Sequence, residues 1–566
     1  MKIPVDTRKE LLRRYGALKT ERERWMPHWR EISDFLLPHH GIGLSGRSSD
    51  KEISGDKRMQ HIFDGTALRA MRVLSAGLMG GLTSPSRPWF RLSLPDQDLY
   101  DRQDVKEWLF QVEERMRAVL AKSTGYTALH HTYGELAGFG TGAMGMFESF
   151  HKVVHFRPMT VGEYMLAVDS RGVVDTCYRE INMTARQMVQ EFGEDNVSQS
   201  VLNSYRNGGG ENRFFVIHIV EPNTDGVDLP QLVNFPFRSV YMEKGGEDDK
   251  ILRVSGYEEF PFLTPRWFVV GAQVYGRSPG MEVLPDVKQL QKETKAKLKA
   301  LDKMVDPPLR VPGHPNELTI NTTPGGLTYD VPAGLGGADS GIRPLYQVQP
   351  DMNGVLIDIQ DLRVQIREGL FNDLFMMLAS QPSNSQMTAR EVAERHEEKM
   401  VMLGPVLERL HGELLGPMID RLFSIMSRVD MLPEPPEDLQ GQDLKVEFIS
   451  ILAQAQKMMG IGAVDAFAGF VGGLANLKPD VLDKVDFDEA VNVYADRTGV
   501  PPGVLVPEDE VEDLRRQRAQ MELSQQALAE TESAARAAKD LSAAQTSDPS
   551  MLQPVAGMMG IPGVPG

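Results

Sequence analysis

Cysteine is almost absent from this chain, since its 566 residues include one, Cys177. A single cysteine excludes an internal disulfide framework and a cysteine-rich zinc site, and it is typical of proteins that remain in a reducing compartment. We therefore expect Cys177 to be a small buried side chain rather than a reactive group.

The sequence also lacks the pattern of a signal peptide and a clear membrane span. Residues 1–14 are charged and have no continuous apolar core. The run 458–477 is apolar, but it is rich in glycine and alanine and carries Asp465, where a carboxylate would be costly in lipid. We expect a pair of buried helices in this run and no membrane insertion.

Motifs for nucleotide and hydrolytic chemistry are missing. No Gly-Lys pair occurs, so the chain has no P-loop and is not itself a nucleotide-driven motor. The pattern Gly-x-Ser-x-Gly occurs once, at Gly276-Arg277-Ser278-Pro279-Gly280. Its oxyanion hole would need the backbone N–H of the residue after the serine, and proline has none. We therefore predict a turn here, no enzymatic activity and no cofactor.

Patterns of metal ligands are weak. His39-His40 and His130-His131 are pairs of neighbours in the sequence, and we expect such neighbours not to converge on one ion. Asp358 and Asp361 lie one turn apart on a predicted helix and could chelate a cation, although a solvated helix face explains them more simply. We predict no metal site.

Positive charge is scarce, because 79 acidic residues outnumber 61 basic ones and give a net charge of −18. Proteins that bind DNA without sequence preference usually have a basic face. If this chain meets nucleic acid, it must let the polymer slide or hold it only at local basic spots.

What the sequence does contain is a central pattern of helix, insert and helix. Apolar residues recur at helical spacing over 281–305 and again over 353–379. Asp306-Pro307-Pro308 ends the first helix, since proline cannot continue the hydrogen-bond ladder. The insert 307–350 is rich in proline and glycine and contains short strand-like runs. We predict two antiparallel helices with a compact insert at their tip.

A stripe of cations follows these two helices. Lysines recur every three or four residues on the first helix, and two arginines lie one turn apart on the second. These cations are Lys288, Lys292, Lys295, Lys299, Lys303, Arg363 and Arg367. Such a line of charges can follow a phosphate backbone. A solvated face, or salt bridges to a neighbouring chain, would produce the same pattern.

A polar run over 380–387 ends the second helix, and a third long helix follows it. Thr388-Ala389-Arg390-Glu391 has the form of a capping box at its start. Gly404-Pro405 and Gly416-Pro417 predict bends, because proline removes a helical hydrogen bond.

The flanking regions differ in character. Residues 8–37 predict an amphipathic helix kinked at Pro27, and 147–274 alternate between apolar and polar residues as antiparallel strands do. Residues 431–510 carry fifteen acidic and five basic residues, and 508–544 predict one long helix with few apolar anchors, which needs a partner. Together these patterns predict an α+β, helix-rich protein of several domains.

Several short stretches connect the chain with a known family through their order and spacing. They are Phe63-Asp64-Gly65-Thr66-Ala67, 78–90, Gly138-Phe139-Gly140-Thr141-Gly142, 275–280, Met387-Thr388-Ala389-Arg390-Glu391-Val392 and 449–456. In this arrangement the chain resembles the portal (head-to-tail connector) proteins of short-tailed, T7-like bacteriophages.

The resemblance implies a non-enzymatic virion protein that is assembled in the host cytoplasm and located at the portal vertex of the capsid. Portal proteins form a dodecameric ring, through which a separate terminase packages double-stranded DNA and through which the DNA is ejected at infection. The implied partners are further copies of the chain, DNA in the channel, terminase during packaging, tail or adaptor proteins at the clip, and major capsid and scaffolding proteins at the wing.

The resemblance also implies how the chain divides. The expected parts are a wing (1–280, helical over 1–145 and β-rich over 146–280), a first stem helix (281–306), a clip (307–350), a second stem helix (351–379), a tunnel loop (380–387), a long bent helix of the wing and crown (388–430), a crown with a C-terminal helix (431–545) and a disordered tail (546–566). The stem cations would then face the DNA channel. The tunnel loop would meet DNA through polar side chains, namely Gln381, Ser383, Asn384, Ser385 and Gln386.

Two other functions stay open on the residues alone. One is a structural capsid or tail-tube protein without a DNA channel. The other is a metal-dependent nuclease that uses Asp358 and Asp361.

Overall fold

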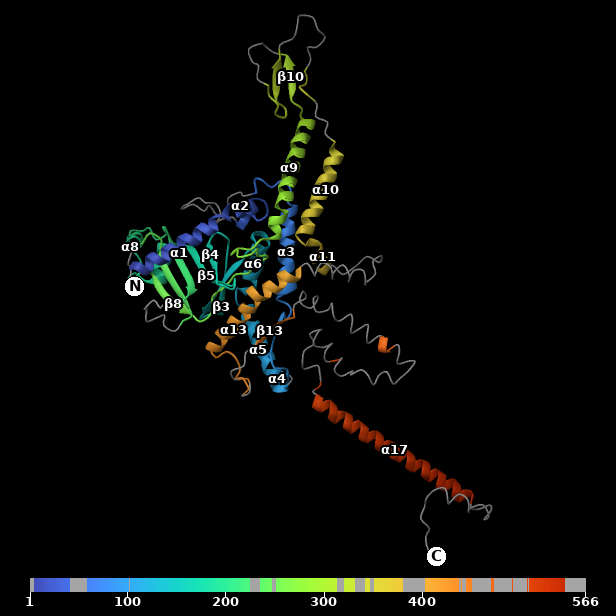
Figure 1. Cartoon of the computed structure of the whole chain (residues 1–566). Coiled ribbons are helices and arrows are strands. Elements are labelled where there is room, and N and C mark those ends of the chain that lie inside the picture. Colours follow the sequence, from blue (N-terminus) through green and yellow to red (C-terminus); the bar gives the residue numbers. More distant parts are fainter. Residues whose placement is uncertain are drawn as a thin grey trace. The chain divides into compact units, whose positions relative to one another are not determined.

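The structure is a computed structural model of the whole chain. It describes residues 5–40, 59–100, 102–223, 235–246, 251–312, 320–330, 342–346, 351–379, 403–436, 439, 444–449, 470–472, 491, 506 and 508–544. The chain divides into two units, Met1–Arg497 and Thr498–Gly566, and each is described by itself (Figure 1).

The N-terminal segment forms two helices where the sequence predicted one. α1 (Val5–Glu23) and α2 (Met26–Phe35) are separated by a turn, and a short 3-10 helix, η1 (Pro38–His40), follows them. Pro27 occupies the first turn of α2, where its missing N–H costs nothing. The proline therefore starts a new helix rather than kinking an existing one.

Several helices pack together with one short strand to form a helical core. α3 (Thr66–Leu82) packs against α6 (Gly125–Phe139), and α5 (Gln103–Lys122) covers β1 (Phe90–Ser93), with the short α4 (Gln97–Tyr100) before it. One continuous apolar cluster joins these helices to the first turns of the central helix, α9 (Pro279–Val305).

The β-rich region contains two antiparallel sheets, as the alternating pattern predicted. The larger has the order β4-β5-β6-β7-β8 and the smaller the order β3-β2-β9. The strands are β2 (Ala143–Ser149), β3 (Val153–Met159), β4 (Tyr164–Val168), β5 (Val174–Thr184), β6 (Arg213–Pro222), β7 (Phe237–Glu243), β8 (Arg253–Tyr257) and β9 (Phe262–Leu263), and the helices α7 (Ala185–Phe192) and α8 (Gln199–Arg206) connect β5 with β6.

The sequence pattern did not predict two strands of this region. β2 begins with four consecutive buried residues, and both residues of β9 are buried, so neither strand shows the alternation of a half-exposed sheet. The mixed class of helices and sheets is nevertheless confirmed.

The central helix pair is present, but its second helix differs from the predicted one. α9 (Pro279–Val305) confirms the first helix, and α10 (Met352–Gly369) runs beside it (Figure 1). The second helix was predicted to continue to 379, but it breaks at Phe371, which has a φ of +55°, and resumes as α11 (Asn372–Ala379). The break lets α11 pack on α3, where Phe375 lies against Gly77.

The insert between α9 and α10 holds a small sheet with the order β11-β10-β12. β10 (Leu309–Pro312) pairs in parallel with β11 (Leu327–Asp330) and antiparallel with β12 (Arg343–Pro344). In Figure 1 β10 lies beyond the far end of α9, as the prediction of an insert at the tip requires.

The long third helix is described from residue 403 onward. It is helical over 403–410, widens into a π-helical turn at His411–Leu415, labelled η3, and continues as α13 (Gly416–Arg428). The predicted bend at Gly416-Pro417 therefore takes the form of a π turn. β13 (Lys445–Phe448), which the sequence did not predict, pairs with β1 across more than 350 residues.

The second unit contains α17 (Glu508–Ala544), which confirms the predicted C-terminal helix. Most of the acidic region 431–510, the tunnel loop 380–387 and the tail 546–566 lie outside the described residues. Among the described helices, none combines the length and the hydropathy that crossing a bilayer requires.

Candidate functional site

Two glycine-rich stretches that are far apart in the sequence form one joint at the base of α9. α6 ends at Gly140, whose φ is +78°, a conformation that favours glycine. A Cβ on Gly140 would lie 2.4 Å from the carbonyl oxygen of Gly276, and a Cβ on Gly276 would lie 2.3 Å from the oxygen of Gly140. The two backbones can approach this closely only because both residues are glycine.

Hydrogen bonds complete this joint. The Gly276 N–H donates to Thr141 Oγ1 at 2.8 Å, and the Trp267 N–H donates to the Gly140 oxygen at 2.9 Å. Ser278 is 1% exposed. Its hydroxyl donates to the Gly138 oxygen at 2.7 Å and accepts from the Met281 N–H at 3.0 Å. Ser278 is thus the N-cap of α9 and not a nucleophile, as Pro279 indicated.

A second joint fastens both central helices to Asp64, which precedes α3. Gln291 of α9 accepts from the N–H of Asp64 at 2.8 Å and donates to its carbonyl oxygen at 2.8 Å. Arg363 of α10 donates to Asp64 Oδ2 at 2.9 and 2.7 Å. Burial alone would raise the pKa of Asp64, but hydrogen bonds from Thr66 and Arg363 hold this pKa below its usual value.

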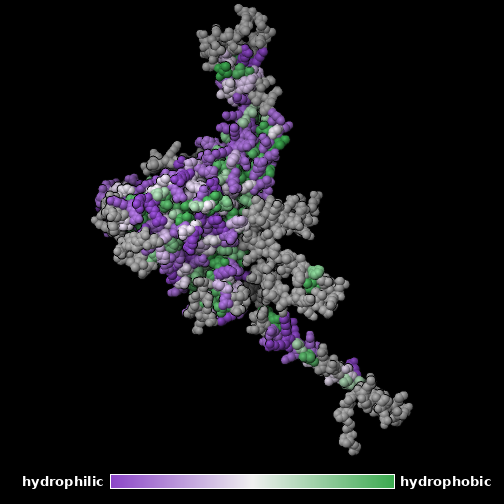
Figure 2. All heavy atoms as spheres, viewed as in Figure 1, coloured by the Kyte–Doolittle hydropathy of each residue, from purple (hydrophilic) through white to green (hydrophobic). Residues whose placement is uncertain are grey.

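The two helices are packed into the protein along only part of their length. The buried side chains of α9 all belong to residues up to Gln291, and those of α10 are Ile359, Leu362 and Ile366. Toward the insert, and at Val364 between two of these buried positions, the helices expose large apolar side chains, and Figure 2 shows hydrophobic patches among the hydrophilic surface there. We call this set the shaft surface; it consists of Leu298, Leu301, Met304, Val305, Leu356, Ile357 and Val364, exposed by 43, 44, 45, 79, 46, 65 and 39%.

Four of the seven predicted channel cations have partners within the chain. Lys288 pairs with Glu31 at 2.6 Å, and Arg363 is held by Asp64. Lys295 Nζ lies 5.2 Å from the ring centroid of Phe63. Lys303 Nζ donates to the hydroxyl of Tyr346 in the insert at 2.7 Å.

The other three cations are Lys292, Lys299 and Arg367. The two lysines are exposed and the arginine is half-buried. Within the described part of the chain, none of the three has a hydrogen-bond or ion-pair partner. Of the seven predicted channel cations, these three are left available to an outside anion.

The remaining predicted site residues do not converge with these. Gln381, Ser383, Asn384, Ser385 and Gln386 lie outside the described residues. Asp358 and Asp361 are exposed on α10 and belong to no cluster of three possible metal ligands among the residues that the structure describes. The geometry gives no support to a nuclease at these carboxylates.

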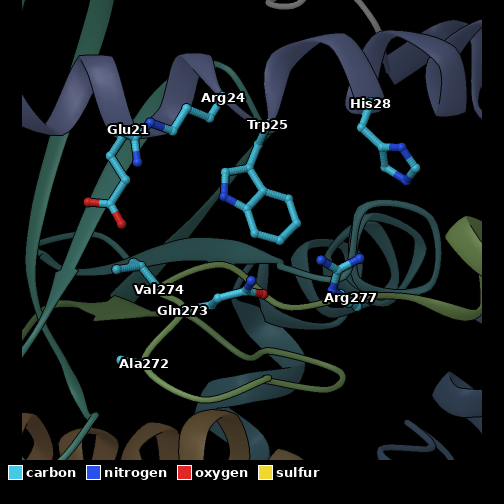
Figure 3. Close-up of a pocket in the computed structure, with 8 residues that line it drawn as sticks. All are labelled: Glu21, Arg24, Trp25, His28, Ala272, Gln273, Val274 and Arg277. Carbon is cyan, nitrogen blue, oxygen red and sulfur yellow. The ribbon is translucent and has the colours of Figure 1, made fainter.

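A pocket of about 490 Å³ lies where the α1–α2 junction faces the segment 272–277 (Figure 3). In Figure 3 the indole of Trp25 points from the helix junction into the pocket, and the guanidinium of Arg277 lies 5.6 Å from its ring centroid. None of the lining residues is a serine, threonine or cysteine. The lining therefore offers no hydroxyl or thiol nucleophile.

Sequence reasoning missed the residues that anchor the helix pair. In the sequence Gln291 is one polar position on an amphipathic helix, and Asp64 is one member of a short motif. The signal that could have found the first joint was the glycine content of 138–142 and 275–280, since repeated glycine indicates close backbone approach.

Comparison with known proteins shows the family of this chain. The family described as bacteriophage head to tail connecting protein matches residues 8–505. The chain belongs to this family. As a member of this head to tail connecting family, it is a structural protein of a phage, and the prediction that it is not an enzyme is confirmed.

Its relatives are portal proteins. The portal protein of Salmonella phage epsilon15 is 46% identical over 563 residues, which cover 99% of this chain and 100% of the relative. The probable portal protein of Bordetella phage BPP-1 is 46% identical over 535 residues, or 94% of this chain and 95% of the relative. These matches confirm the portal resemblance and decide against the two other functions that the sequence left open.

Among solved structures, a chain of the virion of a native gene transfer agent particle aligns with 72% of this chain and 87% of its own length. Its TM-score is 0.35 and its sequence identity 11%, values too low to support an argument about the fold.

Proposed function

We propose that copies of this connector assemble into a ring, a dodecamer as the resemblance implies, whose axial channel is walled by α9 and α10 and conducts double-stranded DNA into and out of the capsid. The observation that carries the proposal is the shaft surface. Exposed apolar side chains of this number on paired helices are the pattern of an interface that further copies of the same chain cover.

In this arrangement the three available cations supply the contacts with DNA. Lys292, Lys299 and Arg367 repeat once in every copy, so the channel presents sparse and evenly distributed positive charge. The chain's net charge of −18 opposes tight binding. A conduit needs this balance, because each phosphate that is neutralised strengthens attachment and would slow sliding.

The domain assignment follows from the same proposal. Residues 1–280 form the wing toward major capsid and scaffolding proteins, α9 with α10 and α11 the stem, 380–387 the tunnel loop, 388–430 the long helix, and 431–545 the crown, with the tail 546–566 after it. The insert 307–350 forms the clip that terminase and later tail or adaptor proteins contact. Its exposed apolar side chains support this role, Ile320 and Ile342 being 73 and 66% exposed.

Electron microscopy of the purified full-length protein tests the proposal. We expect closed rings with an axial hole wide enough for a DNA duplex, and the stem helices along that hole. A matched variant, Leu301→Asp with Ile357→Asp, places charge on the shaft surface and should reduce the fraction of rings. Rings with a lumen too narrow for a duplex, or stem helices directed away from the axis, would contradict the channel.

A further inference from the structure

A group of three side chains at the end of the N-terminal helices has the composition of a metal site. His131 and Glu135 lie one helical turn apart on α6, and His40 reaches them from η1. Their possible ligand atoms all lie within 4.8 Å of one another. The structure thus unites one histidine from each of the two sequence pairs, although the neighbours within each pair do not converge.

We propose that His40, His131 and Glu135 bind a divalent transition-metal ion, with Zn²⁺ as the expected occupant. Two imidazoles and one carboxylate are a common protein ligand set for Zn²⁺. Nitrogen ligands favour Zn²⁺, Co²⁺ or Ni²⁺ over Mg²⁺ and Ca²⁺, which prefer oxygen.

The state of Glu135 supports the proposal. Its side chain is 0% exposed, and a buried carboxylate is costly without a positive partner. Glu135 Oε1 lies 2.5 Å from His40 Nδ1, and Oε2 accepts from the Val161 N–H at 3.1 Å. The backbone N–H therefore fixes the carboxylate from behind, as outer partners of metal ligands do.

His131 supplies the second, independent observation. Its Nδ1 is buried and has no hydrogen-bond partner among the described residues. A ring nitrogen without a hydrogen-bond partner can offer its lone pair to a metal ion. The rings of His40 and His131 are stacked with centroids 4.9 Å apart.

The distances allow one ion to join the three groups. Zn²⁺ lies about 2.0–2.2 Å from nitrogen and oxygen ligands, so two ligand atoms of one ion are at most about 4.4 Å apart. All candidate ligand atoms lie within 4.8 Å of one another, so a shift of a few tenths of an ångström at most brings the widest pair within this span. The side chain of His40 is 25% exposed, and this exposure provides the entry path for the ion.

Bound there, the ion would tie η1 to α6. The C-terminal end of α6 holds Ser278 and thereby the start of α9, so the tie would stiffen the base on which the helix pair stands. This role does not depend on the proposed DNA channel.

The chain offers matched controls for the test, because His39 and His130 are exposed neighbours of the two proposed ligands. Untagged full-length protein is stripped with chelator and then equilibrated with Zn²⁺ or Co²⁺. Bound metal per chain is measured by mass spectrometry, and the visible absorption of Co²⁺ reports its coordination by the protein. We expect one ion per chain in the wild type, in His39→Gln and in His130→Gln.

For His40→Gln and His131→Gln we expect the affinity to fall by at least about 100-fold, since loss of an outer partner alone costs about 10–100-fold. Metal should also raise the thermal midpoint of the wild type and of both controls. The proposal is overturned if the wild type binds no metal, or if His39→Gln and His130→Gln lose as much metal as the two ligand variants. If one ligand variant fails to fold, the other ligand variant and the two controls still locate the ion, and a wild type that binds no metal still overturns the proposal.

Discussion

At the scale of single residues, Glu113 is a buried acid whose ionisation opposes folding. Its side chain on α5 accepts from the Leu92 N–H of β1 at 2.8 Å. Burial raises the pKa of Glu113 to about 7, although the Leu92 N–H and the nearby Arg117 and Arg91 act in the opposite direction.

This raised pKa makes the stability of the folded chain dependent on pH. The pKa of a glutamate in an unfolded chain is about 4.3, and that of Glu113 in the folded chain is about 7. Between these values the folded state holds a proton that the unfolded state has released, so the contribution of Glu113 to stability falls as the pH rises.

Glu113→Gln should therefore leave the thermal midpoint unchanged at pH 4 and raise it relative to the wild type at pH 8. The amide oxygen of glutamine can still accept from Leu92. Thermal unfolding of both proteins at the two pH values measures the difference. The adjacent and exposed Glu114→Gln is the control, and it should show no pH-dependent difference. An equal shift of Glu113→Gln at both pH values would contradict the assignment.

At the scale of elements, the base of α9 depends on contacts between backbones. The joint of 138–142 with 275–280 places Gly140 and Gly276 against each other, and the cap of Ser278 joins α6 to α9. These two stretches are among those that carry the family resemblance. Their glycines are explained by the closeness of two chain segments rather than by a reaction.

Gly276→Ala should destabilise the protein by about 1–3 kcal/mol, the usual cost of inserting a methyl group into a packed site. The added Cβ would lie 2.3 Å from the Gly140 oxygen, so a backbone segment must move. Thermal unfolding monitored by circular dichroism measures the destabilisation.

Gly134→Ala on α6 is the matched control, because a Cβ there meets nothing within 4 Å. It should be neutral or stabilise the helix by up to about 1 kcal/mol. A Gly276→Ala variant as stable as Gly134→Ala would show that the joint tolerates more space than the structure indicates.

The long third helix illustrates how an element bends. Its π turn at His411–Leu415 directly precedes Gly416-Pro417, and proline cannot supply the N–H that a regular helix needs. The turn also directs Glu413 to Arg266, which donates to it at 2.6 Å from Nη2 and at 2.9 Å from the backbone N–H. The irregularity is thus stabilised by a buried arginine.

At the scale of the whole molecule, the charge distribution decides how the connector would handle DNA. Lys292 and Lys299 have no partner among the described residues, whereas Lys288, Lys295 and Lys303 are engaged within the chain. Of these five lysines, only the first pair can be reversed in charge without breaking an interaction that the structure describes within the subunit.

Lys292→Glu combined with Lys299→Glu should leave ring assembly intact and reduce the length or retention of packaged DNA. In vitro, the slope that relates duplex affinity to salt concentration should become shallower by roughly 0.9 for each phosphate that the variant no longer neutralises. Micrographs, packaged DNA length and phage titre are the measurements.

The control for this variant is Lys122→Glu with Lys152→Glu, which makes the same charge change at exposed positions outside the central helix pair. Normal packaging and titre in the stem variant would remove these lysines from the mechanism.

The sequence by itself predicted most of the long helices, and its short motifs indicated the family. The end of α9 follows from Asp306-Pro307-Pro308, because the effect of proline on a helix reaches over only a few residues. The alternation of 147–274 likewise predicted a sheet.

Only the tertiary structure decided which residues meet. It paired β13 with β1 and broke the second helix of the central pair at Phe371. It also divided the predicted channel cations into those with a partner in the chain and those without one. It also fastened Gln291 and Arg363 to Asp64 and brought His40 to His131. Periodicity and capping are local properties of a chain, whereas these contacts depend on distances between segments that lie far apart in the sequence, and such distances exist only once the core has packed.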